Sequence, residues 1–235
     1  MKGEIVAAVF ARGGSRGIPR KNLVTVGGVS LVGRAVHTAL ACASVDRVLV
    51  STDDAEIARV AVEFGAEVPW LRPEALAADD SPELLSWRHC VEACEAEGRP
   101  VRLLVAVPAT APLRDVSDVD ACIAAALADE AVDVVLAVTE AHRNPWFNMV
   151  VLDDAGRATL VNKGPSVFRR QDAPAVYDVT TIAFAARPDF IRQATTLYEG
   201  TVRAVVVPRE RSLDIDTPYD LAVAECLLQK APDPE

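Results

Sequence analysis

The run IVAAVFA at residues 5–11, followed by RGGSRGIPRKN at 12–22, decides the fold class. A short apolar run that ends in a glycine-rich turn is typical of a buried strand. Similar β-branched runs occur at 47–52, 67–71, 102–107 and 132–139, and longer alanine-rich segments separate them. This alternation predicts βα units that wind a mostly parallel sheet with helices on both faces, a three-layer αβα architecture.

Capping residues and prolines mark where the helices of this architecture are expected to begin. One helix should follow the strand at 47–52, where residues 51 to 54 offer caps. Another should begin with Ser81 as cap and Pro82 at the first helical position. Further helices are expected from near residues 117 and 188, and from 218 to about 228.

The alternation of strand-like and helix-like segments is interrupted between about residues 140 and 175. Turn signals at 154–156 and 163–165 flank hairpin-like segments, which predicts an inserted β-rich lobe. The α/β pattern resumes afterwards, so a single domain over residues 1–235 is expected to contain this lobe.

Composition argues against several classes of protein. The 235 residues are 51% apolar and carry a formal net charge of -10, which disfavours nucleic-acid binding. No segment reaches the roughly 20 consecutive apolar residues that cross a bilayer. We expect a cytoplasmic protein with no membrane or nucleic-acid partner. The five scattered cysteines suggest reduced, buried thiols, and Cys90 and Cys94 lack the second pair that a zinc site would need.

The glycine-rich loop after the first strand is unusually basic. It lies where open α/β sheets bind ligands, and it holds three glycines and four cations: Gly13, Gly14, Gly17, Arg12, Arg16, Arg20 and Lys21. Glycines let backbone N–H groups approach a phosphate closely. Clustered cations repel each other, so in an otherwise acidic protein they indicate a binding site for a polyanion. The loop matches neither a P-loop nor the dinucleotide fingerprint. A solvated surface turn is the alternative interpretation.

Several ordered motifs resemble the acylneuraminate cytidylyltransferase family, which makes CMP-activated sialic acids and related 3-deoxy sugar acids. They are the loop ARGGSRGIPRKNL, STDD-x-EIA, LRPEALAADDSP at 71–82, TAPLR at 110–114, FRRQDAP at 168–174 and SLDIDTPYD at 212–220. The resemblance spans nearly the whole chain. It implies a Rossmann-like nucleotidyltransferase fold and transfer of CMP from CTP to a hydroxyl of an acidic sugar, with release of pyrophosphate.

The resemblance also implies roles for individual residues. The nucleotide-binding positions would be Arg12, Gly14, Ser15, Lys21, Asn22, Arg72 and Ser81. Arg12 and Lys21 would also be catalytic, because fixed cations can offset the charge that grows on the leaving pyrophosphate. Arg72 matches a position beside the cytosine, although an ordinary surface arginine is the alternative.

Asp214 and Asp216 are the candidate metal ligands and complete the catalytic set. Alternate residues of a strand point to one face, so both carboxylates could hold one Mg²⁺ together with substrate phosphates. A metal-activated hydroxyl would then attack the α-phosphorus of CTP. The same segment also has the features of a capped helix start, with Asp216 or Thr217 as cap and Pro218 at the first helical position.

Arg169, Arg170 and Gln171 are the candidate acceptor-binding residues, because arginine pairs with carboxylates in a two-pronged geometry. An exposed basic pair is the alternative. In relatives the lobe that carries them forms a homodimer interface and reaches the partner's active site.

Two segments depart from the family pattern and put a standard sialic acid acceptor in doubt. The chain reads PATAPLR at 108–114, without the usual glutamine and serine, and Thr180-Thr181 replaces a common Asn-Gly. Transfer to a non-sugar carboxylate or phosphonate, or use of another base, stays open. Two other functions also stay open: a glycosyltransferase that uses a nucleotide sugar, and a non-catalytic nucleotide-binding module.

Overall fold

A six-stranded sheet forms the centre of the protein, in a computed structural model that describes residues 3–15, 17–164 and 167–230. The strands are ordered β10-β6-β9-β5-β1-β4. Their bounds are β1 (Glu4–Phe10), β4 (Arg47–Ser51), β5 (Val101–Ala106), β6 (Val134–Glu140), β9 (Tyr177–Ala186) and β10 (Val202–Val206). Only β9 among them pairs antiparallel with its neighbours, so the expected mostly parallel sheet is confirmed.

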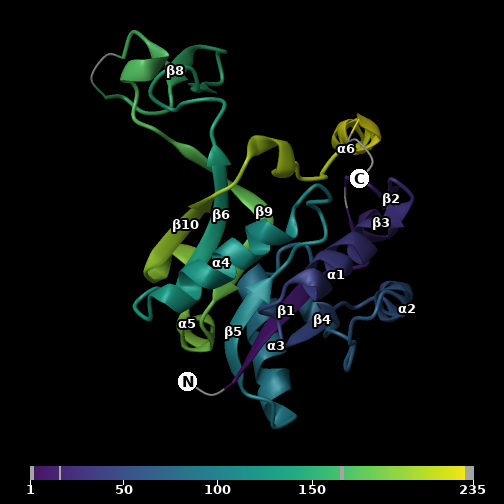
Figure 1. Cartoon of the computed structure of the whole chain (residues 1–235). Coiled ribbons are helices and arrows are strands. Elements are labelled where there is room, and N and C mark those ends of the chain that lie inside the picture. Colours follow the sequence, from purple (N-terminus) through teal and green to yellow (C-terminus); the bar gives the residue numbers. More distant parts are fainter. Residues whose placement is uncertain (1–2, 16, 165–166, 231–235) are drawn as a thin grey trace.

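Side chains alternate between the two faces of the sheet along each strand, so a separate apolar core lies on each face. In β1, Val9 contributes to one core while Val6 and Ala8 contribute to the other. The first core is covered by α1 (Leu31–Ala41), α2 (Ala55–Glu63), α4 (Val116–Ala128) and α6 (Pro218–Lys230). The second is covered by α3 (Glu83–Ala96) and α5 (Pro188–Gln193), which completes the three layers visible in Figure 1.

Two local predictions were wrong. Residues 67–71 do not form a strand, because only Glu67 bridges to Leu49 and a proline follows two residues later. The helix expected to be capped by Ser81 begins at Glu83, with Pro82 in the capping position and no side-chain cap.

Other helix starts follow the sequence signals more closely. Asp54 caps α2 by accepting from the backbone N–H groups of Glu56 and Ile57. Asp115 and Asp118 form a capping box at the start of α4. Thr217 and Asp220 exchange hydrogen bonds at the start of α6, so Thr217 rather than Asp216 acts as the cap.

The segment between β6 and β9 contains the predicted hairpin, β7 (Val150–Leu152) and β8 (Ala158–Leu160), as a separate two-stranded sheet. Figure 1 shows it standing away from the main sheet, beyond the ends of β6 and β9. Both short strands are exposed along their whole length. No helix in the described part of the chain is long and apolar enough to cross a bilayer.

Candidate active site

A cavity of about 430 Å³ lies beside the loop that follows β1. It is lined by residues from four distant parts of the chain: the basic loop, residues 72–86, the turn after β5, and the segment before α6. Of the nine residues predicted for the nucleotide and metal, seven line it: Arg12, Ser15, Lys21, Asn22, Arg72, Ser81 and Asp216. Gly14 and Asp214 do not line it.

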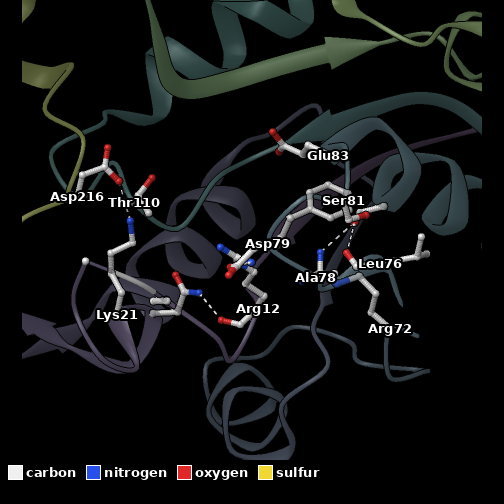
Figure 2. Close-up of a pocket in the computed structure, with 15 residues that line it drawn as sticks. Arg12, Lys21, Arg72, Leu76, Ala78, Asp79, Ser81, Glu83, Thr110 and Asp216 are labelled. Carbon is white, nitrogen blue, oxygen red and sulfur yellow. Dashed lines mark hydrogen bonds and ion pairs between the residues drawn. The ribbon is translucent and has the colours of Figure 1, made fainter. Parts of the chain in front are cut away.

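Two cations of the basic loop point into this cavity, and each is paired with a carboxylate. Arg12 Nη1 lies 2.6 Å from Asp79 Oδ1 and Lys21 Nζ lies 2.9 Å from Asp216 Oδ1, as Figure 2 shows for the second pair. The amide of Asn22, which is buried, donates to the carbonyl of Arg12 at 2.9 Å and holds the two ends of the loop together. A polyanion could therefore take over two positioned cations from their protein partners.

The loop closes against the segment before α6 through Gly17. A Cβ atom at that position would collide with the backbone carbonyl of Asp216, so only glycine allows this close approach. At the other end of the loop, the Gly13 N–H donates to Asp53 Oδ1 at 3.0 Å.

Not all of the predicted basic cluster faces the cavity. Arg20 adopts a left-handed backbone (φ 54°) and pairs with Glu56 at 2.7 Å and Asp54 at 3.3 Å, on the side of α2. Arg16 lies outside the described residues. The cations of this loop that line the cavity, among the described residues, are thus Arg12 and Lys21.

Arg72 is a buried cation on another wall of the cavity. Its Nη1 donates to Ser86 Oγ at 3.0 Å, and its Nη2 lies 3.9 Å from Asp53 Oδ1. Burial lowers the pKa of the Arg72 guanidinium, and the nearby Asp53 carboxylate opposes that shift. The alternative of an ordinary surface arginine is therefore wrong.

Asp214 and Asp216 differ in environment although they are two residues apart. The Asp216 side chain is 72% exposed, whereas Asp214 Oδ1 is buried without a hydrogen-bond partner among the described residues. Burial raises the pKa of Asp214, and Thr110 opposes the shift. Two nearby carboxylates, one with an unsatisfied oxygen, fit a hard cation that takes its other ligands from phosphates. In the described part of the chain, no three His, Cys, Asp or Glu side chains form a denser metal cluster.

The segments 108–114 and 180–181 take part in the packing of the sheet. The buried Arg114 guanidinium donates to the carbonyls of Pro108, Ala111 and Thr181, and so joins the loop after β5 to β9. Burial lowers the pKa of Arg114 to about 9. Thr180 Oγ1 donates to the carbonyl of Ala137 inside the sheet. Thr110 is the one residue of the two segments that lines the cavity.

The predicted acceptor-binding residues lie elsewhere, at the base of the lobe. Arg170 and Gln171 line a separate hollow of about 570 Å³ with Asn144 and Tyr177. Arg170 Nη2 donates to the carbonyl of His142 at 3.1 Å, and the exposed Arg169 pairs with Asp172 at 2.9 Å. Within one chain, these residues do not line the cavity beside the basic loop.

Sequence reasoning missed the acidic residues of the cavity, Asp79 and Glu83. The run LAADDSPE offered three carboxylates in one segment without indicating which face inward. Phe10, the last residue of β1, also lines the cavity but was assigned only to a strand.

Comparison with known proteins gives the family. Residues 6–231 match the cytidylyltransferase family, and the chain belongs to it. The chain is 27% identical to the CMP-N,N'-diacetyllegionaminic acid synthase of Campylobacter jejuni, over 96% of this chain and 95% of that protein. It is 32% identical to N-acylneuraminate cytidylyltransferase B of Danio rerio, over 93% of this chain and 50% of that protein. The fold matches a CMP:2-keto-3-deoxy-manno-octonic acid synthetase solved with CTP (TM-score 0.73, 19% identity, 97% of this chain and 100% of that one).

Proposed function

We propose that this chain transfers CMP from CTP to a hydroxyl of an acidic sugar of the nonulosonate or 3-deoxy sugar acid kind, with release of pyrophosphate. The observation that carries the proposal is the convergence of Arg12, Lys21 and Asp216 in one cavity of a cytidylyltransferase-family chain. Relatives named for legionaminic, pseudaminic and neuraminic acids support the acceptor class.

The triphosphate would displace Asp79 from Arg12 and Asp216 from Lys21. Both cations would then hold phosphate oxygens and stabilise charge on the departing pyrophosphate, where a fixed positive charge is most effective. Asn22 keeps the loop in this shape through its hydrogen bond to the Arg12 carbonyl.

Asp214 and Asp216 would hold Mg²⁺, with phosphate oxygens as further ligands. When bound, the ion would make the acceptor hydroxyl a better nucleophile and neutralise phosphate charge. Release of Lys21 from Asp216 frees the exposed carboxylate for this purpose.

The acceptor carboxylate would meet Arg169, Arg170 and Gln171 from a second copy of the chain. The lobe exposes a set of large apolar side chains that a monomer leaves in water: Met149, Val150, Val151, Leu152, Leu160, Val161 and Phe168. An isolated two-stranded hairpin is marginally stable, so burial against a partner would stabilise it. We therefore propose a homodimer through the lobe.

We place the reaction in the cytoplasm. All five cysteines are free thiols, and four of them are buried, which suits a reducing compartment.

The experiment that tests the function is incubation of the purified chain with Mg²⁺, each nucleoside triphosphate and a panel of sugar acids. We expect a CMP-sugar to form only with CTP. Sugar transfer from an added nucleotide sugar, with no CMP-sugar formed from CTP, would support a glycosyltransferase. CTP binding without turnover across the panel would support a non-catalytic module.

A further inference from the structure

Among the described residues, Glu83 is the carboxylate of this cavity that forms no ion pair. Asp79 and Asp216 also line the cavity, but each is paired with a cation of the basic loop. Glu83 forms no ion pair with any described residue. In Figure 2 it lies apart from Lys21 and Asp216, near Ser81 at the start of α3.

The Glu83 carboxylate is held in place from one side. The indole N–H of Trp87, one helical turn further on, donates to Glu83 Oε1 at 3.2 Å. Trp87 is 1% exposed and packs against Phe10 and Phe184, with ring centroids 6.3 and 5.7 Å away, so its position is fixed by the core. Glu83 Oε2 has no hydrogen-bond partner among the described residues.

The side chain faces the open cavity, yet the surrounding protein atoms raise the pKa of Glu83 by desolvation. The Trp87 hydrogen bond and the charge of Arg72 oppose that shift. Glu83 is exposed at the cavity, so its second carboxylate oxygen is open to accept from a ligand donor, and its charge repels phosphate. Glu83 should therefore face the nucleoside half of CTP and not its triphosphate.

Glu83 and the guanidinium of Arg72 line the same cavity, and a carboxylate combined with a guanidinium suits cytosine. The cytosine edge presents an amino donor beside two acceptors, which suits an acceptor from Glu83 and donors from Arg72. Uracil presents a carbonyl in place of the amino group, and that oxygen would face the carboxylate without a proton between them.

Building on the proposed function, we propose that Glu83 selects cytosine over uracil by accepting a hydrogen bond from the exocyclic amino group of the base. The substitution Glu83→Gln tests this. The Gln amide oxygen can keep the Trp87 hydrogen bond, which turns its NH₂ group toward the base. That group matches the uracil carbonyl and opposes the cytosine amino group.

The measurement is calorimetric titration of the wild type and the variant with CTP, UTP and 2′-deoxy-CTP in the presence of Mg²⁺ and without acceptor. We expect the CTP-to-UTP affinity ratio to fall about tenfold or more in Glu83→Gln, with tighter UTP binding. The matched control Glu74→Gln, on an exposed residue outside the cavity lining, should leave the ratio unchanged.

Three other outcomes would overturn the assignment. An unchanged ratio in Glu83→Gln with CTP binding intact would remove Glu83 from base selection. Loss of discrimination between CTP and 2′-deoxy-CTP, with the uracil ratio unchanged, would mean that Glu83 contacts the ribose. Failure of the wild type to bind either ribonucleotide would overturn the proposed function and, with it, this role.

Discussion

Replacement of Lys21 by methionine separates the contribution of this residue to catalysis from its contribution to stability. The Lys21 side chain is 16% exposed, lines the cavity and pairs with Asp216 at 2.9 Å. If its ammonium stabilises the leaving pyrophosphate, its loss should lower kcat by about 100- to 1000-fold, the usual effect of removing one fixed donor from a transition state. Methionine retains most of the aliphatic stem, so packing should change little.

The folding cost of the same substitution should be small. Asp216 is 72% exposed, so its carboxylate stays solvated when Lys21 is lost, and such a pair contributes about 0.2–1 kcal/mol. In a chain of this size that corresponds to a shift of no more than about 4 °C in Tm. Pyrophosphate release and thermal unfolding, measured on the same preparation, give both quantities.

Arg20→Met is the matched control, because Arg20 comes from the same loop, is 53% exposed and pairs with Glu56 away from the cavity lining. It should keep kcat within about twofold, since surface substitutions away from a site usually have small effects. Equal losses of activity in the two variants, or a large loss of stability in Lys21→Met alone, would refute the assignment of Lys21 to the phosphates.

Three further predictions follow from single features of the structure. Asp216→Asn should lower turnover at saturating CTP by at least about a hundredfold, as pyrophosphate release with varied Mg²⁺ would reveal, while loss of the Lys21 ion pair shifts the thermal midpoint by no more than about 4 °C. One thiol per native chain, that of the exposed Cys226, should react with a disulfide reagent at pH 8. The other four thiols are buried, and burial raises the pKa of Cys42 and Cys122 to about 12. Reaction of all five thiols before unfolding would contradict this packing. Leu152, in the lobe, is 67% exposed, so Leu152→Glu should convert the proposed dimer into a monomer and lower transfer activity. Light scattering measures the change, and an unchanged dimer would place the interface elsewhere.

The sheet could be predicted because its strands carry their own signal. The apolar runs of β1, β4, β5 and β6 are bounded by turns and buried on both faces, so composition and position agree. Residues 67–71 failed the same test, since a strand depends on a partner as well as on β-branched residues, and only Glu67 finds one.

The site was predicted in part. A loop of cations after the first strand indicated phosphate binding, and the structure places Arg12 and Lys21 in the cavity. The outward direction of Arg20 depends on one left-handed residue, which no local pattern indicates. Glu83 was missed because an acid in the first turn of a helix is common for electrostatic reasons alone. Its role becomes visible only when Trp87 and the cavity are seen together.

The central claim, transfer of CMP from CTP through this cavity, is tested most directly by following the phosphorus atoms. Phosphorus NMR of the chain with CTP, Mg²⁺ and a sugar acid should show the three triphosphate signals replaced by pyrophosphate and a new phosphodiester. Appearance of CDP or orthophosphate, or intact CTP with every sugar acid, would contradict the account.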